Sequence, residues 1–237
     1  MGFAVLAQSV PLPCSHPAFA LYHRMLKSAF ALLLAAMPLG AAIPETARAS
    51  NEPPISQRTI ETSPHDPLQH WEFDYETGVI RKVGGGATPL VYVVLPQLLT
   101  WKLPVVGRRP FAGGELSIRT RLSLLIEPII KGPESRYLGA SASGCVEWWN
   151  AERTTSFFFS SGGGLGVMDS KGHQIKGAQG QDLNFNWLVY VGARKKWTPR
   201  MSASLGLYFQ HVSNTGLDKI NPGLNALGPM FGLSWHY

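Results

Sequence analysis

Residues 116–125 read LSIRTRLSLL, a stretch in which apolar and polar side chains alternate with a period of two. One face carries aliphatic side chains and the other carries serine and arginine: Leu116, Ile118, Leu122 and Leu124 against Ser117, Arg119, Arg121 and Ser123. Strict alternation over this length predicts a β-strand, because successive side chains of a strand point to opposite faces.

The same alternation recurs along most of the chain, for example in WEFDYE (71–76) and NFNWLVYVGARKKW (184–197). It predicts eight strands, near residues 70–80, 88–101, 114–128, 137–149, 153–168, 182–198, 200–213 and 225–237. Several of these segments exceed the ~3–10 residues that are typical of strands in soluble proteins. They reach the roughly 9–11 residues that a tilted strand needs to cross a membrane.

Two fold classes are compatible with this pattern. A soluble sandwich or calyx barrel buries its apolar face, whereas a transmembrane barrel turns that face to lipid and lines its lumen with polar residues. Glycine and serine recur on the polar faces, as a narrow lumen requires, and an even number of strands closes without an unpaired edge in lipid. We therefore predict an all-β protein, an eight-stranded antiparallel transmembrane β-barrel of the bacterial outer membrane. A soluble lipid-binding calyx is the weaker alternative.

The last predicted strand supports the membrane class. Phe231, Leu233, Trp235 and Tyr237 alternate through residue 237. A final strand that ends on an aromatic residue resembles the assembly signal of bacterial outer-membrane proteins, which implies localisation in the outer membrane.

The first 69 residues are expected to lie outside the barrel. Residues 25–50, MLKSAFALLLAAMPLGAAIPETARAS, combine a lysine, a short apolar run and a small-residue cleavage site, as in a secretory signal peptide. We expect translation to start at Met25, residues 1–24 to be an upstream extension, and cleavage to follow Ala49. Residues 50–69 form a polar, proline-rich tail, which leaves 70–237 as the barrel domain.

Composition excludes several classes of function. The formal charge of +6 is scattered along the chain, and its densest cluster is the triplet at 194–196, so nucleic acid is not an expected partner. Signal-peptide removal would leave Cys145 as the one cysteine and exclude an intramolecular disulfide. No cysteine, histidine and carboxylate spacing fits a metal site, and no cofactor is expected.

The stretch FQHVSN (209–214) carries the candidate catalytic residues. The predicted links at 150–152 and 198–199 are short and those at 169–181 and 214–224 are long, which puts FQHVSN at the extracellular end of its strand. Strand parity places His211 and Ser213 on the same lipid-facing stripe. Residues two apart on a strand lie about 6.5–7 Å apart, close enough for His211 to activate Ser213 as a nucleophile.

Two asparagines extend this candidate site. Asn214 follows Ser213 and offers an amide donor for an oxyanion hole. Asn225 begins the next strand with lipid-facing parity and faces the site across the hairpin. The alternative is that His211 and Ser213 only mark the membrane interface of a non-catalytic structural or adhesion barrel, in which case they lie apart or face different ways.

Three stretches carry a family resemblance: HVSNTGLDKINPGLN (211–225), GGGLGVMD (162–169) and AQGQDLNFNWLVYVGARKKWTP (178–199). They resemble the outer-membrane lipid A 3-O-deacylases, many of which are called acyloxyacyl hydrolases. The resemblance implies an eight-stranded barrel with its site on the outer surface, and a reaction that removes the ester-linked acyl chain at the 3-position of lipid A. It also implies that His211 is the general base, Ser213 the nucleophile and Asn214 a contributor to the oxyanion hole.

The implied partners are lipid A or lipopolysaccharide in the outer leaflet and the surrounding lipids, and a homodimer is left open. One position departs from the family pattern. The best-known members orient the histidine with a glutamate, and the matching position here is Asn225, which can hold the histidine tautomer but supplies no charge. Asp218 in the adjoining loop is a second candidate for the acidic role.

Overall fold

The computed structural model describes residues 70–84 and 88–237, and the expected signal peptide, start site and tail lie outside the described residues. The strands are β1 (Glu72–Gly78), β2 (Ile80–Lys82), β3 (Val93–Val94), β4 (Gln97–Lys102), β5 (Gly107–Phe111), β6 (Gly114–Lys131), β7 (Arg136–Trp149), β8 (Thr155–Met168), β9 (Leu183–Thr198), β10 (Met201–Ser213) and β11 (Leu224–His236). No helix in the described part of the chain has the length and apolarity needed to cross a membrane.

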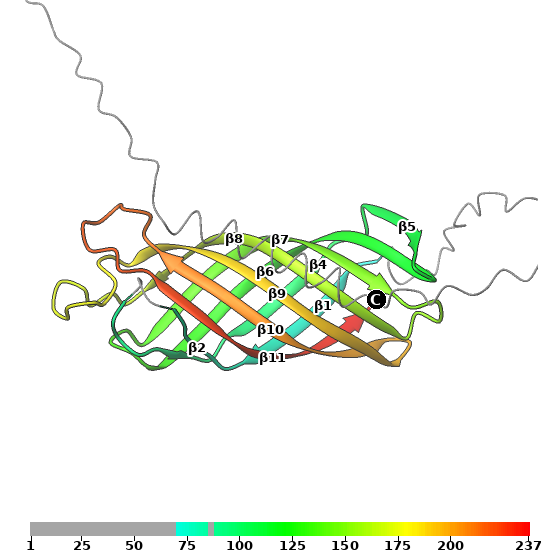
Figure 1. Ribbon diagram of the computed structural model, residues 1–237, viewed down its shortest axis with the longest axis horizontal. Coiled ribbons are helices and arrows are strands. Elements are labelled where there is room, and N and C mark those ends of the chain that lie inside the picture. Colours follow the sequence, from blue (N-terminus) through cyan, green and yellow to red (C-terminus); the bar gives the residue numbers. More distant parts are fainter. Residues whose placement is uncertain (1–69, 85–87) are drawn as a thin grey trace, which may run out of the picture. The chain divides into compact units, whose positions relative to one another are not determined.

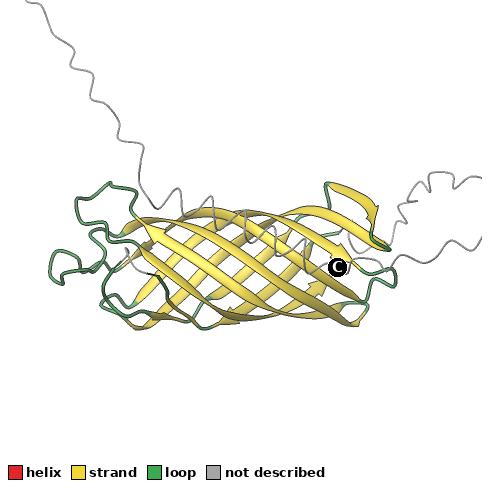
Figure 2. Ribbon diagram, viewed as in Figure 1, coloured by secondary structure: helices red, strands yellow, loops and turns green. Residues whose placement is uncertain are grey.

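Eight of these strands form a closed antiparallel ring (Figure 1). The order around the ring is β1, β4, β6, β7, β8, β9, β10 and β11, and β11 pairs back with β1. The short strands β2 and β3 continue β1 and β4 and fill the gap between β11 and β6. Closure pairs every strand of the ring on both sides, so the ring has no exposed edge (Figure 2).

The two ends of the barrel differ in their connections. We call one the long-loop end, since it carries residues 169–182 and 214–223, together with the described residues 83–84 and 88–92 and the tight turn 132–135. The other is the short-turn end, where 150–154 and 199–200 join their strands.

Each of the eight predicted segments overlaps one strand of the ring, β2 lies mostly beyond the predicted end at residue 80, and β5 was not predicted. β5 forms a hairpin with the start of β6 at the short-turn end, where the sequence led us to expect only a connection. Ala112 and Gly113 both have positive φ angles, the pair of conformations that a two-residue type I′ turn needs. Pro110 is tolerated because β5 lies at an edge, outside the ring.

The two faces of the ring are inverted relative to a soluble barrel. Large apolar side chains are exposed on the outside: Ile118, Leu122, Leu124, Ile126, Leu138, Val146, Phe157, Leu165, Val167, Phe185, Leu205, Leu207, Leu227 and Phe231. Charged and polar side chains of the same strands are buried in the lumen: Glu72, Asp74, Glu76, Lys102, Ser117, Arg119, Arg121, Glu127, Glu147 and Arg194. An apolar exterior around a polar interior is the arrangement of a transmembrane β-barrel, and the predicted fold class is confirmed.

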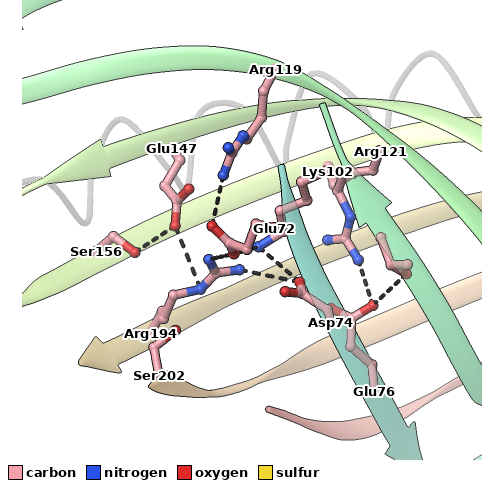
Figure 3. Close-up of polar contacts among 12 residues, drawn as sticks. Glu72, Asp74, Glu76, Lys102, Arg119, Arg121, Glu147, Ser156, Arg194 and Ser202 are labelled. Carbon is pink, nitrogen blue, oxygen red and sulfur yellow. Dashed lines mark hydrogen bonds and ion pairs between the residues drawn. The ribbon is translucent and has the colours of Figure 1, made fainter. Parts of the chain in front are cut away.

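Most of the buried charges lie toward the short-turn end of the lumen as paired groups (Figure 3), whereas Glu127 accepts a hydrogen bond from Gln210 near the other end. The Glu72 carboxylate lies 2.6 Å from Lys102 Nζ and 2.8 Å from Arg119 Nη1. Arg194 binds the same carboxylate, and its Nη2 lies 3.4 Å from Asp74 Oδ2. Buried charges are tolerated where each has a partner, so this network lets a polar lumen close without isolated ions.

Replacing Arg194 with methionine is expected to lower the free energy of unfolding by about 3–5 kcal/mol, because Glu72 and Asp74 lose a buried cation. Urea titration of the barrel in lipid vesicles measures the change. Lys195→Met is the matched control, since Lys195 is the next residue on the outward face, and we expect its effect to stay below about 0.5 kcal/mol. Equal losses in the two variants would contradict a stabilising role of the network.

Candidate active site

Strand β10 brings His211 and Ser213 together on the outside of the barrel. Both side chains are half-buried and share the outward face, since the intervening Val212 points into the lumen. His211 Nε2 lies 3.0 Å from Ser213 Oγ, within hydrogen-bond reach. The predicted pair is therefore in contact, at the long-loop end of the strand.

Strand β11 supplies the second partner of the imidazole. Asn225 is directly opposite His211 in the antiparallel ladder, and its Oδ1 lies 2.6 Å from His211 Nδ1. An amide oxygen can only accept, so the proton of the neutral imidazole sits on Nδ1 and the lone pair of Nε2 faces Ser213. This is the tautomer that a general base next to a serine requires.

Apolar and glycine contacts surround the imidazole. Trp187 is the cross-strand neighbour of His211 on β9, and its ring packs edge-on against Phe209 with centroids 5.4 Å apart. Gly223 lies behind the imidazole, where an added Cβ would come within 3.4 Å of His211 Cε1. Its φ of +67° is in the left-handed region that favours glycine. Glycine at this position therefore allows the turn and leaves space beside the imidazole.

The side chain of Asn214 is bonded inside the loop that follows Ser213. It is fully buried, its Nδ2 donates to the Ile220 carbonyl at 2.9 Å, and its Oδ1 accepts from the Gly216 N–H at 2.9 Å. These contacts hold the first turn of the loop. The predicted contribution of Asn214 to an oxyanion hole therefore stays a prediction, since the contacts of its side chain serve the loop.

Asn221 lies in the loop after Ser213, and no role was predicted for it from the sequence. Its Oδ1 accepts from the backbone N–H of Asn214, the residue that follows Ser213, at 3.1 Å, and the Asn221 residue is exposed. The signal in the sequence was the Asn-Pro-Gly triplet at 221–223, which we used for the family resemblance without assigning a role to its first member.

Asp218, the second candidate for the acidic role, is engaged elsewhere. Its Oδ1 accepts from the Ile220 N–H at 2.7 Å, and its Oδ2 lies 3.3 Å from His173 Nε2 in the neighbouring loop. The Nδ1 atom of His211 contacts Asn225 instead. Asn225, not Asp218, is thus the residue that orients the imidazole of His211.

The loop at 169–182 is held at its base by a carboxylate. Asp182 Oδ1 accepts from both the hydroxyl and the N–H of Ser170, at 2.7 and 3.0 Å. These hydrogen bonds stabilise the ionised form and lower the pKa of Asp182 below its ordinary value. The contact of His173 with Asp218 joins this loop to the one that follows Ser213.

The geometry also bears on the non-catalytic alternative, which would be favoured by an Nε2–Oγ distance beyond about 4 Å together with no acceptor for Nδ1. Neither is observed, because the Nε2–Oγ distance is 3.0 Å and Nδ1 faces an amide oxygen. The arrangement brings a hydroxyl, an imidazole and an amide oxygen into one hydrogen-bonded chain.

Three comparisons with known proteins bear on the family of the chain. A protein-family model described as lipid A 3-O-deacylase (PagL) matches residues 98–234, more than half of the chain. A search of curated protein sequences found no match. Among solved structures, the chain is similar to one described as the crystal structure of the outer membrane enzyme PagL, with 16% identity, coverage of 68% of this chain and 97% of that chain, and a TM-score of 0.45. The matched family model runs from β4 to β11 and takes in His211, Ser213 and Asn225, so the chain belongs to the lipid A 3-O-deacylase (PagL) family.

Proposed function

We propose that the protein is a serine esterase of the outer membrane that removes the ester-linked acyl chain from the 3-position of lipid A. The observation that carries this proposal is the contact of His211 with both Ser213 and Asn225 on the lipid-facing surface. The 3-position of the ester comes from the description of the family.

The position of the pair on the barrel supports a lipid substrate. Outer-membrane barrels have short periplasmic turns and longer extracellular loops, so we assign the long-loop end to the cell exterior. Ser213 is the last residue of β10 at that end and faces outward. A nucleophile at this level meets the ester bonds of lipids in the outer leaflet, where lipid A lies.

The first half of the reaction transfers the acyl chain to the enzyme. Ser213 Oγ attacks the ester carbonyl carbon while His211 Nε2 takes the hydroxyl proton, which forms a tetrahedral oxyanion. The bond from the carbonyl carbon to the sugar oxygen then breaks. His211 returns the proton to that oxygen, so the sugar leaves with a free 3-hydroxyl and the acyl chain stays on Ser213.

The second half regenerates the enzyme. His211 Nε2 removes a proton from water as the water oxygen attacks the acyl carbonyl carbon. The bond to Ser213 Oγ breaks, the serine regains its proton from His211, and the fatty acid departs. Asn225 holds the imidazole by its Nδ1–H throughout both halves.

The oxyanion needs donors that are already in place, and we infer that the amide of Asn221 is one of them. Its Oδ1 accepts from the N–H of Asn214, the residue that follows Ser213, and Asn221 is exposed, so its NH₂ group is free to turn toward a substrate at Ser213. Fixed donors of this kind stabilise developing charge without reorganisation.

Asn221→Asp is expected to lower kcat by about 10²–10³-fold with little change in KM, because the donor is lost while the oxygen that accepts from Asn214 is kept. Steady-state hydrolysis of a long-chain ester in mixed micelles measures both constants. A variant that keeps the kcat of the wild-type protein would contradict the assignment.

Mass spectrometry of lipid A from Gram-negative cells that express the protein tests the function itself. The expected product is lipid A that lacks one hydroxyacyl chain and retains all of its phosphates. Cells with an empty vector provide the control, and an unchanged acylation pattern in the expressing cells would overturn the proposal.

A further inference from the structure

Gly180 lies where the loop at 169–182 packs against the loop at 214–223. It is buried, and a Cβ added to it would stand 2.2 Å from the carbonyl oxygen of Ile220 and 2.7 Å from the Cβ of the same residue. Both distances are below 3.0 Å, a separation that real Cβ atoms essentially never show. Only hydrogen therefore fits as the side chain at this point of contact between the two loops.

The space beside Gly180, and not its backbone conformation, requires glycine. The φ of Gly180 is outside the positive range that favours glycine, in contrast to the φ of +93° at Gly177 in the same loop. Alanine at position 180 can therefore adopt the same backbone conformation. The effect of that substitution is limited to the contact of its Cβ with the neighbouring loop.

The carbonyl group of Ile220 belongs to the segment that follows the candidate nucleophile. Its oxygen accepts from Asn214 Nδ2 at 2.9 Å, and its carbon forms the peptide bond to Asn221. Asn221 Oδ1 in turn accepts from the Asn214 N–H at 3.1 Å. A displacement of the Ile220 carbonyl therefore disturbs the contacts that connect Asn214 with Asn221.

A buried carboxylate holds the loop at 169–182 next to this contact. Glu134, in the tight turn 132–135, accepts from the Gln179 N–H at 2.8 Å through Oε1 and from Tyr92 Oη at 2.6 Å through Oε2. Glu134 and Gln179 are both buried. Because Gln179 directly precedes Gly180, this hydrogen bond fixes the backbone at the point where it meets Ile220.

Two further contacts hold the same loop. His173 Nε2 lies 3.3 Å from Asp218 Oδ2, and Thr88 Oγ1 donates to the Gly177 carbonyl at 2.5 Å. The N–H of Thr88 donates to the carbonyl of Gly223, the glycine behind the imidazole, at 3.1 Å. The loop at 169–182 is thus connected to every other described segment of the long-loop end.

We propose that Gly180 and Glu134 are positioning residues of the active site, an inference that rests on the proposed function. They keep the Ile220 carbonyl in the place from which Asn221 reaches the oxyanion. A donor of this kind is effective because it is oriented before the charge develops. A displacement of about 1 Å by a residue away from the reacting atoms can lower a rate by about 10²-fold.

Gly180→Ala is expected to lower kcat on p-nitrophenyl myristate in mixed micelles by about 10–10²-fold and to leave KM within about twofold of the wild type. The reason is that the substitution displaces a donor that acts on the transition state. Gly144→Ala is the matched control, since it adds the same methyl group on the outward face of β7, where no atom beyond its chain neighbours lies within 4 Å. We expect wild-type kcat from it.

A double-mutant cycle with Asn221→Asp separates positioning from a general structural effect. In the Asn221→Asp background, Gly180→Ala is expected to lower kcat by less than about threefold, because the donor that it displaces is already absent. Equal factors in the two backgrounds would show that Gly180 acts on stability and not through Asn221. Wild-type kcat in Asn221→Asp itself would also refute the positioning role, while the esterase stands.

Glu134 gives a second test, which decides the proposal if Gly180→Ala does not assemble. Glu134→Ala removes the acceptor of the Gln179 N–H, whereas Glu134→Gln retains an amide oxygen in its place. We expect Glu134→Ala to lower kcat by about tenfold or more and Glu134→Gln to restore most of the loss. Wild-type kcat in Glu134→Ala, or equal losses in both variants, would overturn the positioning role. Hydrolysis that does not depend on Ser213 overturns the proposed function and this inference with it.

Discussion

Replacement of Ser213 by alanine is expected to reduce lipid A deacylation by about 10⁴–10⁶-fold, because it removes the oxygen that is the nucleophile of the proposed mechanism. The serine is half-buried on the outside of β10, and its Oγ contacts His211 at 3.0 Å, so the substitution deletes one hydrogen bond and leaves the barrel wall unchanged. Release of fatty acid from lipid A in vesicles, followed by mass spectrometry of both products, measures the loss.

The matched control for this variant is Ser161→Ala, which removes a hydroxyl from the outward face of β8. We expect wild-type rates from it. Residual deacylation by Ser213→Ala within about tenfold of the wild type would exclude a covalent mechanism at this residue, since background catalysis without a nucleophile retains only a small fraction of the rate.

Asn225→Glu is expected to raise kcat by up to about 10⁴-fold. Asn225 already holds the Nδ1–H of His211 at 2.6 Å, but an amide cannot stabilise by charge the imidazolium that forms during both halves of the reaction. The loss caused by the reverse change, from carboxylate to amide, in a Ser-His-Asp triad sets the upper limit of the gain. Burst and steady-state kinetics on a long-chain ester give the rate of acylation directly.

Asn225→Gln separates the effect of charge from that of length, because glutamine has the size of glutamate and carries no charge. We expect this variant to gain nothing over the wild type. If Asn225→Glu is also no faster than the wild type, the orientation of His211 by Asn225 is sufficient, and proton transfer to His211 does not limit turnover.

The alternation of apolar and polar side chains predicted most of the fold. The stretch at 116–125 and its counterparts predicted every strand of the ring, because the polarity of successive residues records which face of a strand meets lipid and which meets the lumen. The hairpin of β5 escaped this reasoning. Arg108, Arg109 and Pro110 do not alternate, and the hairpin forms through the turn at Ala112 and Gly113 and its pairing with β6.

The candidate site was also predicted only in part. Parity within one strand predicted that His211 and Ser213 share the lipid-facing side, and they lie in contact. The side-chain bonds of Asn214 inside the loop and the position of Asn221 beside it depend on loop conformation, including the positive φ of Thr215. The periodicity of the sequence does not predict these backbone angles.

The sequence by itself therefore determined the all-β class, the number of strands in the ring, the inversion of its faces and the His211–Ser213 pair. These features depend on the direction in which each side chain points along its own strand, which is a local property. Only the tertiary structure decided that Asn225 lies opposite His211 and that Asp218 contacts His173 instead. Those relations depend on the register between strands that closure of the ring imposes, and register is set by the pairing of the whole sheet and not by any one segment.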